Sequence, residues 1–186
     1  MSIEKQILEA LELLVSHAHD PSGHPTALKS DGDGRLLTTT QGALAVTEQV
    51  QAPFGATSGA HDANDAVGNM MTFTVPKMGR ILSVKFIDPG DETSALTLHV
   101  YSKPFVAAAS DAAYTISDED ALNWVTNVTP TMVDEGASQV GEVIDIDSEY
   151  FSESERLYAQ LSTSGTPTWT QAEMPLVQMF ILPLGD

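Results

Sequence analysis

The sequence contains no cysteine, few basic residues and few aromatic residues, and each shortage excludes a class of function. Without cysteine, this 186-residue chain has no disulfides, thiol nucleophiles or thiolate metal sites. Its net charge of −18, from 26 acidic against 8 basic residues, argues against nucleic acid and anionic membranes as partners, because both repel an acidic surface. No apolar run approaches the roughly 18 residues of a membrane-spanning helix. The N-terminal stretch also lacks the basic segment of a signal peptide.

Acidic residues are unevenly distributed along the chain. Twelve Asp and Glu lie between Lys103 and Arg156, a stretch without any Lys or Arg. The simplest interpretation is a solvated acidic face that keeps the protein soluble. The alternative is a surface that binds cations or a basic partner.

Residues 2–16 have the pattern of an amphipathic helix. Ser2 can cap the N-terminus, and Glu4 lies where the helix dipole favours an acid. A helix this short is marginal in isolation, so its apolar stripe is expected to pack on the rest of the chain or on the same helix of sister subunits. The stripe consists of Ile3, Ile7, Leu8, Leu11, Leu14 and Val15.

Most of the remaining chain has the short alternating segments of β-strands, separated by turn signals at about ten-residue spacing. The expected strands cover 70–75, 80–88, 95–102, 114–116, 127–133, 141–147, 155–163 and 174–182. A short helix capped by Ser117 is expected between the fourth and fifth strands. This pattern predicts a mainly β fold, an antiparallel, jelly-roll-like β-sandwich over residues 35–186, preceded by a helix and linker arm over residues 1–34.

The stretch DGDG at residues 31–34 raises the possibility of a calcium loop. An EF-hand loop beginning at Asp31 needs an oxygen ligand at position 5, Gly at position 6 and Glu at position 12. Those positions hold Arg35, Leu36 and Gly42. The stretch therefore predicts a glycine-rich turn, at which the chain reverses or bends sharply, and no calcium ion at Asp31 and Asp33.

Three histidines lie close together at His17, His19 and His24, and imidazoles at this density can bind zinc or nickel. His17 and His19 lack the i,i+4 spacing of helical ligands. The Pro and Gly around them also do not preorganise the imidazoles for metal binding. A role at the helix end, where the dipole favours histidine, is the simpler interpretation. If an oligomer brought copies of His17 or His19 from several subunits together on a symmetry axis, ion binding would be easier.

The acidic motifs at 117–121, 145–150 and 152–156 could supply carboxylates for calcium or for glycosidase chemistry. Glycosidases need two carboxylates at a defined separation beside a sugar cleft, and aromatic residues to stack on sugars are few. Asp145 and Asp147 alternate with apolar neighbours, as on an exposed strand face. No nucleophile elbow, phosphate-binding loop or dinucleotide fingerprint is present. We therefore expect no enzyme, no cofactor and no metal, and Trp124 and Trp169 are expected to be core or interface anchors.

Five segments share an outline with a known group of proteins: Asp65–Gly68, Gly79–Val84, Leu96–Tyr101, Asp118–Asp120 and Leu157–Thr168. On these segments, residues 60–182 resemble virion proteins of tailed bacteriophages. The resemblance implies a β-sandwich on the outer capsid surface, a head decoration (cement) protein that binds the major capsid protein as a homotrimer. The apolar stripe of residues 2–16 would then drive assembly or dock on the shell.

Two other interpretations stay open. A tail, baseplate or fibre component would keep the protein in the virion, and the sequence does not separate head from tail. A carbohydrate-binding β-sandwich, with or without calcium, would hold host glycans. The helical stripe is too short to specify the oligomeric state.

Overall fold

The computed structural model describes residues 28–30, 36–38, 43–54, 60–92 and 95–184. Its contacts divide the chain into two units, Met1–Gly42 and Ala43–Leu184. The expected boundary between residues 34 and 35 falls inside the first unit. The helix expected over residues 2–16, with its stripe, lies outside the described residues, as do His17, His19 and His24; these stay predictions.

In the first unit, two short strands pair with each other. β1 (Leu28–Ser30) and β2 (Leu36–Thr38) are antiparallel, so the chain reverses direction between them. Residues 31–35, which include Asp31 and Asp33, lie outside the described residues. β2 follows the DGDG stretch, whereas β1 lies within the expected helix and linker arm of residues 1–34, for which no strand is expected.

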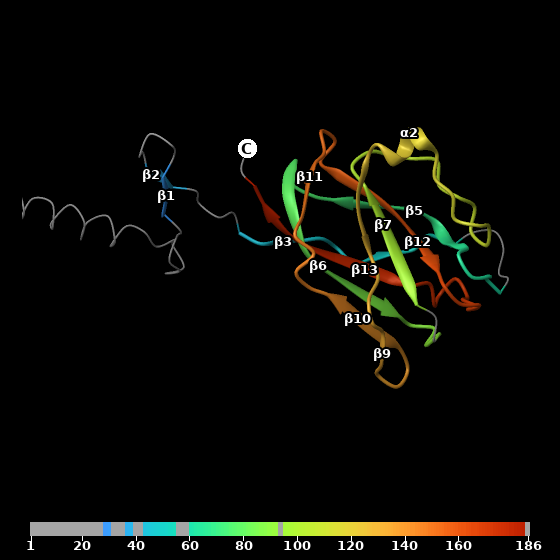
Figure 1. Cartoon of the computed structure of the whole chain (residues 1–186). Helices are drawn as coiled ribbons and strands as arrows, with labels where there is room; N and C mark the ends of the chain where they lie inside the picture. The colour runs from blue at the N-terminus through green and yellow to red at the C-terminus, as the bar shows by residue number, and fades with distance from the viewer. Residues whose placement is uncertain (1–27, 31–35, 39–42, 55–59, 93–94, 185–186) are drawn as a thin grey trace, which may run out of the picture. The chain divides into compact units, whose positions relative to one another are not determined.

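The second unit contains two antiparallel sheets (Figure 1). The large sheet has the order β3-β13-β6-β10-β9, with β4 also paired to β13 and β11 to β6; the small sheet has the order β5-β12-β7-β8. The prediction of a mainly β fold with antiparallel sheets is confirmed. The large-sheet strands are β3 (Ala45–Val46), β4 (Val50–Gln51), β6 (Met78–Asp88), β9 (Val133–Asp134), β10 (Gln139–Val143), β11 (Ser148–Phe151) and β13 (Leu176–Pro183). The small-sheet strands are β5 (Ala66–Thr74), β7 (Leu96–Tyr101), β8 (Trp124–Val128) and β12 (Arg156–Thr163).

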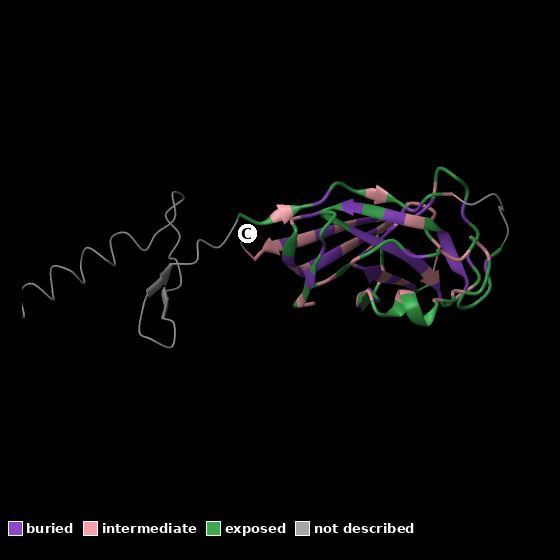
Figure 2. Cartoon of the chain, turned by 90° about the horizontal axis from the view of Figure 1, so that it is seen from above, coloured by how far each residue is buried: buried purple, intermediate pink, exposed green. Residues whose placement is uncertain are grey.

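Both sheets contribute to one hydrophobic core, seen as buried stretches along the strands in Figure 2. Each fully buried aliphatic or aromatic side chain contributes about 1.5–3 kcal/mol. The sheets also come together at their edges, where β4 lies beside β5 and β11 lies beside β8. Core residues include Phe73, Leu98, Val100, Leu157 and Leu161 from the small sheet and Ile81, Val84, Phe86, Val177, Met179 and Ile181 from the large sheet.

A β-bulge changes the faces of β6. Simple alternation predicts that Leu82 shares a face with Val84 and Phe86. In the structure Ile81, Val84 and Phe86 are buried and Leu82 is only half-buried. The register with β13 shifts so that Ile181 lies opposite Ile81 and Phe180 opposite Ser83. Leu82 is therefore the extra residue of a bulge, which turns both Ile81 and Val84 toward the core.

Three expected strands differ from the structure. Residues 114–116 form no strand, and next to them Ala113 makes only an isolated bridge to Asp65. The strand expected over 127–133 is divided between β8 and β9 around Pro130, which cannot donate to a ladder. The strand expected over 141–147 ends with β10 at Val143.

The helix capped by Ser117 is confirmed. α2 (Asp118–Ala121) begins with the Asp120 backbone N–H donating to Ser117 Oγ at 3.1 Å. Its first turn carries Asp118, Glu119 and Asp120, where the helix dipole favours acids. The helix buries none of its residues, and it lies on the surface in Figure 2.

Candidate functional site

The side of the large sheet that faces away from the core is rich in apolar side chains. We call this side the large-sheet outer face. Directly paired residues of antiparallel strands share a face, so the register defines its rows. Val46, Met78, Val133 and Phe151 are about half exposed, between 41% and 55%. The apolar rows are Val133–Val140–Ile87–Leu176, Val46–Phe180 and Phe151–Met78, with Leu182 opposite Arg80.

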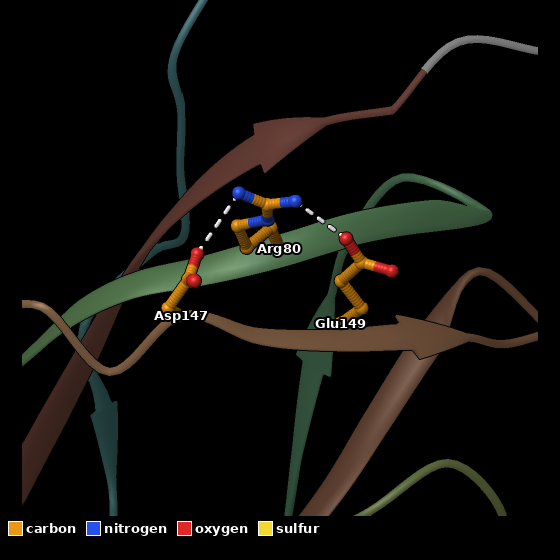
Figure 3. A network of polar contacts seen from close by, with 3 residues as sticks. All are labelled: Arg80, Asp147 and Glu149. Carbon is orange, nitrogen blue, oxygen red and sulfur yellow. Dashed lines mark hydrogen bonds and ion pairs between the residues drawn. The ribbon is translucent and has the colours of Figure 1, made fainter.

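Two basic residues of β6 lie among these apolar rows. Lys85 lies opposite Glu142 and Gln178. Arg80 forms ion pairs with Asp147 at 2.9 Å and with Glu149 at 2.5 Å (Figure 3). The hydrogen bond to Glu149 and the charge of Asp147 raise the pKa of Arg80, so the guanidinium stays charged.

The acidic motif at 145–150 thus holds the connection between β10 and β11 against β6. Asp145 and Asp147 have φ angles of 55° and 53°, in the left-handed region, so the expected exposed strand face is wrong. Between them, the Ile146 backbone N–H donates to Leu82 O at 3.2 Å, beside the bulge. The carboxylates of Asp147 and Glu149 neutralise Arg80 instead of forming a site for a cation.

The small sheet presents a different outer side, because residues 103–117 cross it. We call these residues the covering segment. Gln160 of β12 is fully buried beneath it, and its Nε2 donates to Gly68 O at 2.8 Å and to Ala108 O at 2.7 Å. Its Oε1 accepts from the Ala108 backbone N–H at 3.1 Å. Phe105 packs with Tyr101 and Tyr158 in a second, smaller apolar cluster.

A glycine of β5, Gly68, permits the close packing around the buried Gln160 amide. Gly68 has a φ of 68°, and a Cβ there would lie 2.6 Å from Pro53 O. The register between β5 and β12 is irregular at this point, where Leu161 lies opposite Val67 and Ala159 opposite Met71. Gly68 is the last position of the Asp65–Gly68 segment singled out in the sequence, and its conformation explains why glycine stands there.

A pocket of about 390 Å³ opens where β7, β8, α2 and the covering segment meet. A β-bulge contributes to its lining: Thr126 lies opposite Val100 and Trp124 opposite Tyr101, so Val125 is the extra residue. In a regular strand residues 124 and 127 would face opposite sides, whereas the bulge puts both side chains on the pocket side. The lining includes His99, Tyr101, Tyr114, Ala121, Trp124 and Asn127.

The polar groups of the pocket bond to one another. Trp124 Nε1 donates to Asn127 Oδ1 at 2.9 Å, and the hydroxyls of Tyr101 and Tyr114 lie 2.7 Å apart. The His99 ring stacks on Tyr114 with centroids 4.0 Å apart. Burial lowers the pKa of His99 and raises the pKa of both tyrosines, so all three side chains are uncharged near pH 7. None of the pocket residues was identified as a site from the sequence.

The two tryptophans have different roles. Trp169 is buried, 1% exposed, and its Nε1 donates to Asp88 Oδ1 at 2.8 Å. Burial raises the pKa of Asp88, while this hydrogen bond and those from the Gly90 and Glu92 backbone N–H groups lower it. Trp169 is thus the expected core anchor. Trp124 is 52% exposed, so a core role for it is wrong.

Within the part of the chain that the structure describes, no three His, Asp or Glu side chains gather into a group that could hold a metal ion. Over the same residues, no helix is long and apolar enough to cross a membrane. No protein-family model matches the chain, and no curated protein matches it. The candidate sites therefore rest on geometry: the large-sheet outer face and the aromatic pocket.

Proposed function

We propose that this chain is a non-enzymatic structural protein of a tailed-bacteriophage virion, a head decoration protein that binds the major capsid protein on the outer capsid surface as a homotrimer. The resemblance over residues 60–182 and the acidic, cysteine-free, mainly β domain support this role. Asp88 and Gln160 are among the most deeply buried polar residues in the described part of the chain, and they hold a turn and the covering segment in place. That use of polar groups fits a structural protein.

The proposed architecture is an antiparallel, jelly-roll-like β-sandwich. Its support is the single core shared by both sheets and the approach of their edges at β4 with β5 and at β11 with β8. Such a domain has two outer sheet faces. One of them can contact a shell while the other faces the solvent.

The observation that carries the proposal is the large-sheet outer face. Soluble monomers rarely leave large contiguous apolar patches uncovered, and such patches mark protein interaction sites. Here the apolar rows surround Arg80 and Lys85 in a chain of net charge −18. Arg80 is neutralised by Asp147 and Glu149, and Lys85 lies opposite Glu142, so contact with a partner would rest mainly on the apolar rows. We assign this face as the surface that contacts the capsid.

The helix expected over residues 2–16 has a second part in this proposal. Its stripe, represented by Ile7, Leu11 and Leu14, would join the subunits of the trimer or dock on the shell. Leu11→Asp should then reduce the oligomer mass or the capsid binding, and a variant that keeps both would remove this part of the proposal.

The test uses heads of the encoding phage that lack the protein. We expect the full chain to co-sediment with these heads, to occur in purified virions, and to have the mass of three chains by light scattering. Val46→Asp, at a half-exposed position of the large-sheet outer face, should abolish co-sedimentation. Val106→Asp is the matched control, because Val106 is 82% exposed and lies in the covering segment.

Two results would contradict the proposal. If the wild-type chain does not bind heads and is absent from virions, the decoration role is wrong. If folded Val46→Asp binds as well as the wild type, the contact surface is wrong. A mass of one or two chains would overturn the trimer alone.

A further inference from the structure

We propose that the aromatic pocket between β7, β8 and the covering segment binds a neutral pyranose ring, as one unit of a glycan chain. This inference is independent of the capsid role, because the pocket lies on the small sheet and shares no residue with the large-sheet outer face. It rests on three features of the pocket: a fixed aromatic platform, hydrogen-bonding groups that remain available, and the absence of basic residues from the lining.

Trp124 supplies the platform. The bulge at Val125 turns the indole to the pocket side, and the bond from its Nε1 to Asn127 Oδ1 fixes its orientation. More than half of the side chain is nevertheless accessible, at 52% exposure. A large apolar ring held in place and left uncovered provides contact area at little entropic cost, and the apolar C–H faces of a pyranose can lie flat against it.

The hydrogen-bond pattern fixes the orientation of the Asn127 amide. An indole N–H can only donate, so the atom that Trp124 contacts must be the amide oxygen. His99 Nδ1 lies 3.0 Å from the same oxygen and must therefore carry a proton. His99 Nε2 is then the acceptor for Ser162 Oγ at 2.9 Å, and the neutral ring satisfies both contacts.

This orientation leaves the donors of Asn127 available. Its Nδ2 group makes no hydrogen bond to any described residue, and the side chain is exposed at the pocket. The tyrosine pair adds a further group: one hydroxyl donates to the other across 2.7 Å, and the second hydroxyl keeps its proton for a ligand. A sugar ring carries hydroxyls that accept from an amide and exchange hydrogen bonds with a phenol.

Charge selects against anionic sugars. No Lys or Arg lines the pocket, and α2 beside it begins with Asp118, Glu119 and Asp120. Uronic acids, sialic acids and phosphates would be repelled at this end of the domain. A quaternary ammonium would suit aromatic rings near acids, but it would leave the Asn127 donors unused. The pocket volume of about 390 Å³ is at the small end of ligand sites, which run from roughly 300 Å³ upward.

The experiment uses the full chain labelled with ¹⁵N and follows the two indole N–H signals. A glycan array first selects glycans, and glucose, galactose and N-acetylglucosamine are then titrated to millimolar concentrations, with glucuronic acid and choline in parallel. We expect the Trp124 signal to shift saturably with at least one neutral sugar. Trp169 is an internal reference, because it is 1% exposed and its Nε1 is bound to Asp88.

Two variants and one control locate the site. Trp124→Ala should raise the Kd by about tenfold or more, which corresponds to about 1.4 kcal/mol. Asn127→Asp keeps an oxygen for Trp124 and His99 but removes the amide donors, and it should also weaken binding. Leu122→Ala is the control, because Leu122 is 86% exposed and does not line the pocket. Thermal melting confirms that each variant is folded.

The proposal is overturned if no neutral glycan binds on the array and no neutral sugar shifts the Trp124 signal. It is also overturned if choline or glucuronic acid binds more tightly than every neutral sugar. If both pocket variants are folded and bind sugar as the wild type does, the sugar site lies elsewhere and the pocket assignment is wrong.

Discussion

The outer sides of the two sheets differ in what covers them. On the small sheet the covering segment crosses the strands, and Gln160 and the Tyr101–Tyr114 hydroxyl pair attach it. On the large sheet no described residues cross the outer face, where Val46, Val133 and Phe151 are about half exposed. The chain therefore covers a face of polar and aromatic residues with its own residues, and leaves the more apolar face uncovered by the residues that the structure describes; we propose that a partner contacts it.

The residues that stabilise the fold should therefore differ from those that contact a partner. Buried hydrogen bonds under the covering segment should matter to folding, since a buried polar group without a partner costs about 1–3 kcal/mol. Half-exposed side chains on the large sheet should matter little to folding and much to assembly.

Gln160→Ala should have the largest effect. It leaves the Gly68 carbonyl and both backbone groups of Ala108 without their partner beneath the covering segment. We expect a loss of about 2–4 kcal/mol in urea unfolding. A loss below about 0.5 kcal/mol would show that the covering segment is not held through this amide.

Tyr101→Phe should have an intermediate effect. It removes one hydroxyl of the pair that joins β7 to the covering segment. The Tyr114 hydroxyl then has lost its hydrogen-bond partner. We expect a loss of about 1 kcal/mol. Chemical denaturation measures it, and an unchanged midpoint would mean that the Tyr114 hydroxyl finds water instead.

Lowering the pH should destabilise the folded chain through His99, whose ring stacks on Tyr114 of the covering segment. Burial lowers the pKa of His99 in the folded state, so below its ordinary pKa of about 6.5 the unfolded chain binds a proton that the folded chain does not. Stability should therefore fall as the pH decreases from about 6.5 toward the folded-state pKa. Urea unfolding at several pH values tests this, and His99→Gln should show a smaller decrease over the same window.

Val46→Asp should have the smallest effect on folding. Val46 is half exposed at the edge of the large sheet, so the expected change in the free energy of unfolding is within about 0.5 kcal/mol. If the substitution instead destabilised the isolated chain by about 2 kcal/mol or more, this position would belong to the packed part of the domain.

The sequence pattern predicts the positions of the long strands because their apolar residues alternate over enough residues to be distinctive. β5, β6, β7, β12 and β13 lie close to their expected ranges, and Ser117 caps α2 as expected. Short segments carry too few residues for a distinctive alternation: the Tyr114–Ile116 stretch has the composition of a strand, yet it forms none and belongs to the covering segment.

The bulges and the pocket could not be predicted from local pattern. Leu82 and Val125 are extra residues only in relation to partners far along the chain, and a bulge reverses which side chains face the core. The pocket likewise joins His99, Tyr114 and Asn127 from three separate segments. The signals available beforehand were Trp124 and an adjacent acidic turn, and a tryptophan is more often buried than exposed at a site.

Carbene footprinting of the chain, free and bound to heads, tests the central comparison most directly. We expect that labelling of Val46, Val133 and Phe151 on the large-sheet outer face falls on binding. Labelling of Leu122 and Trp124 beside the pocket should stay unchanged. Protection of Leu122 and Trp124 with continued labelling of Val46 and Val133 would contradict the account, because the small sheet would then face the partner.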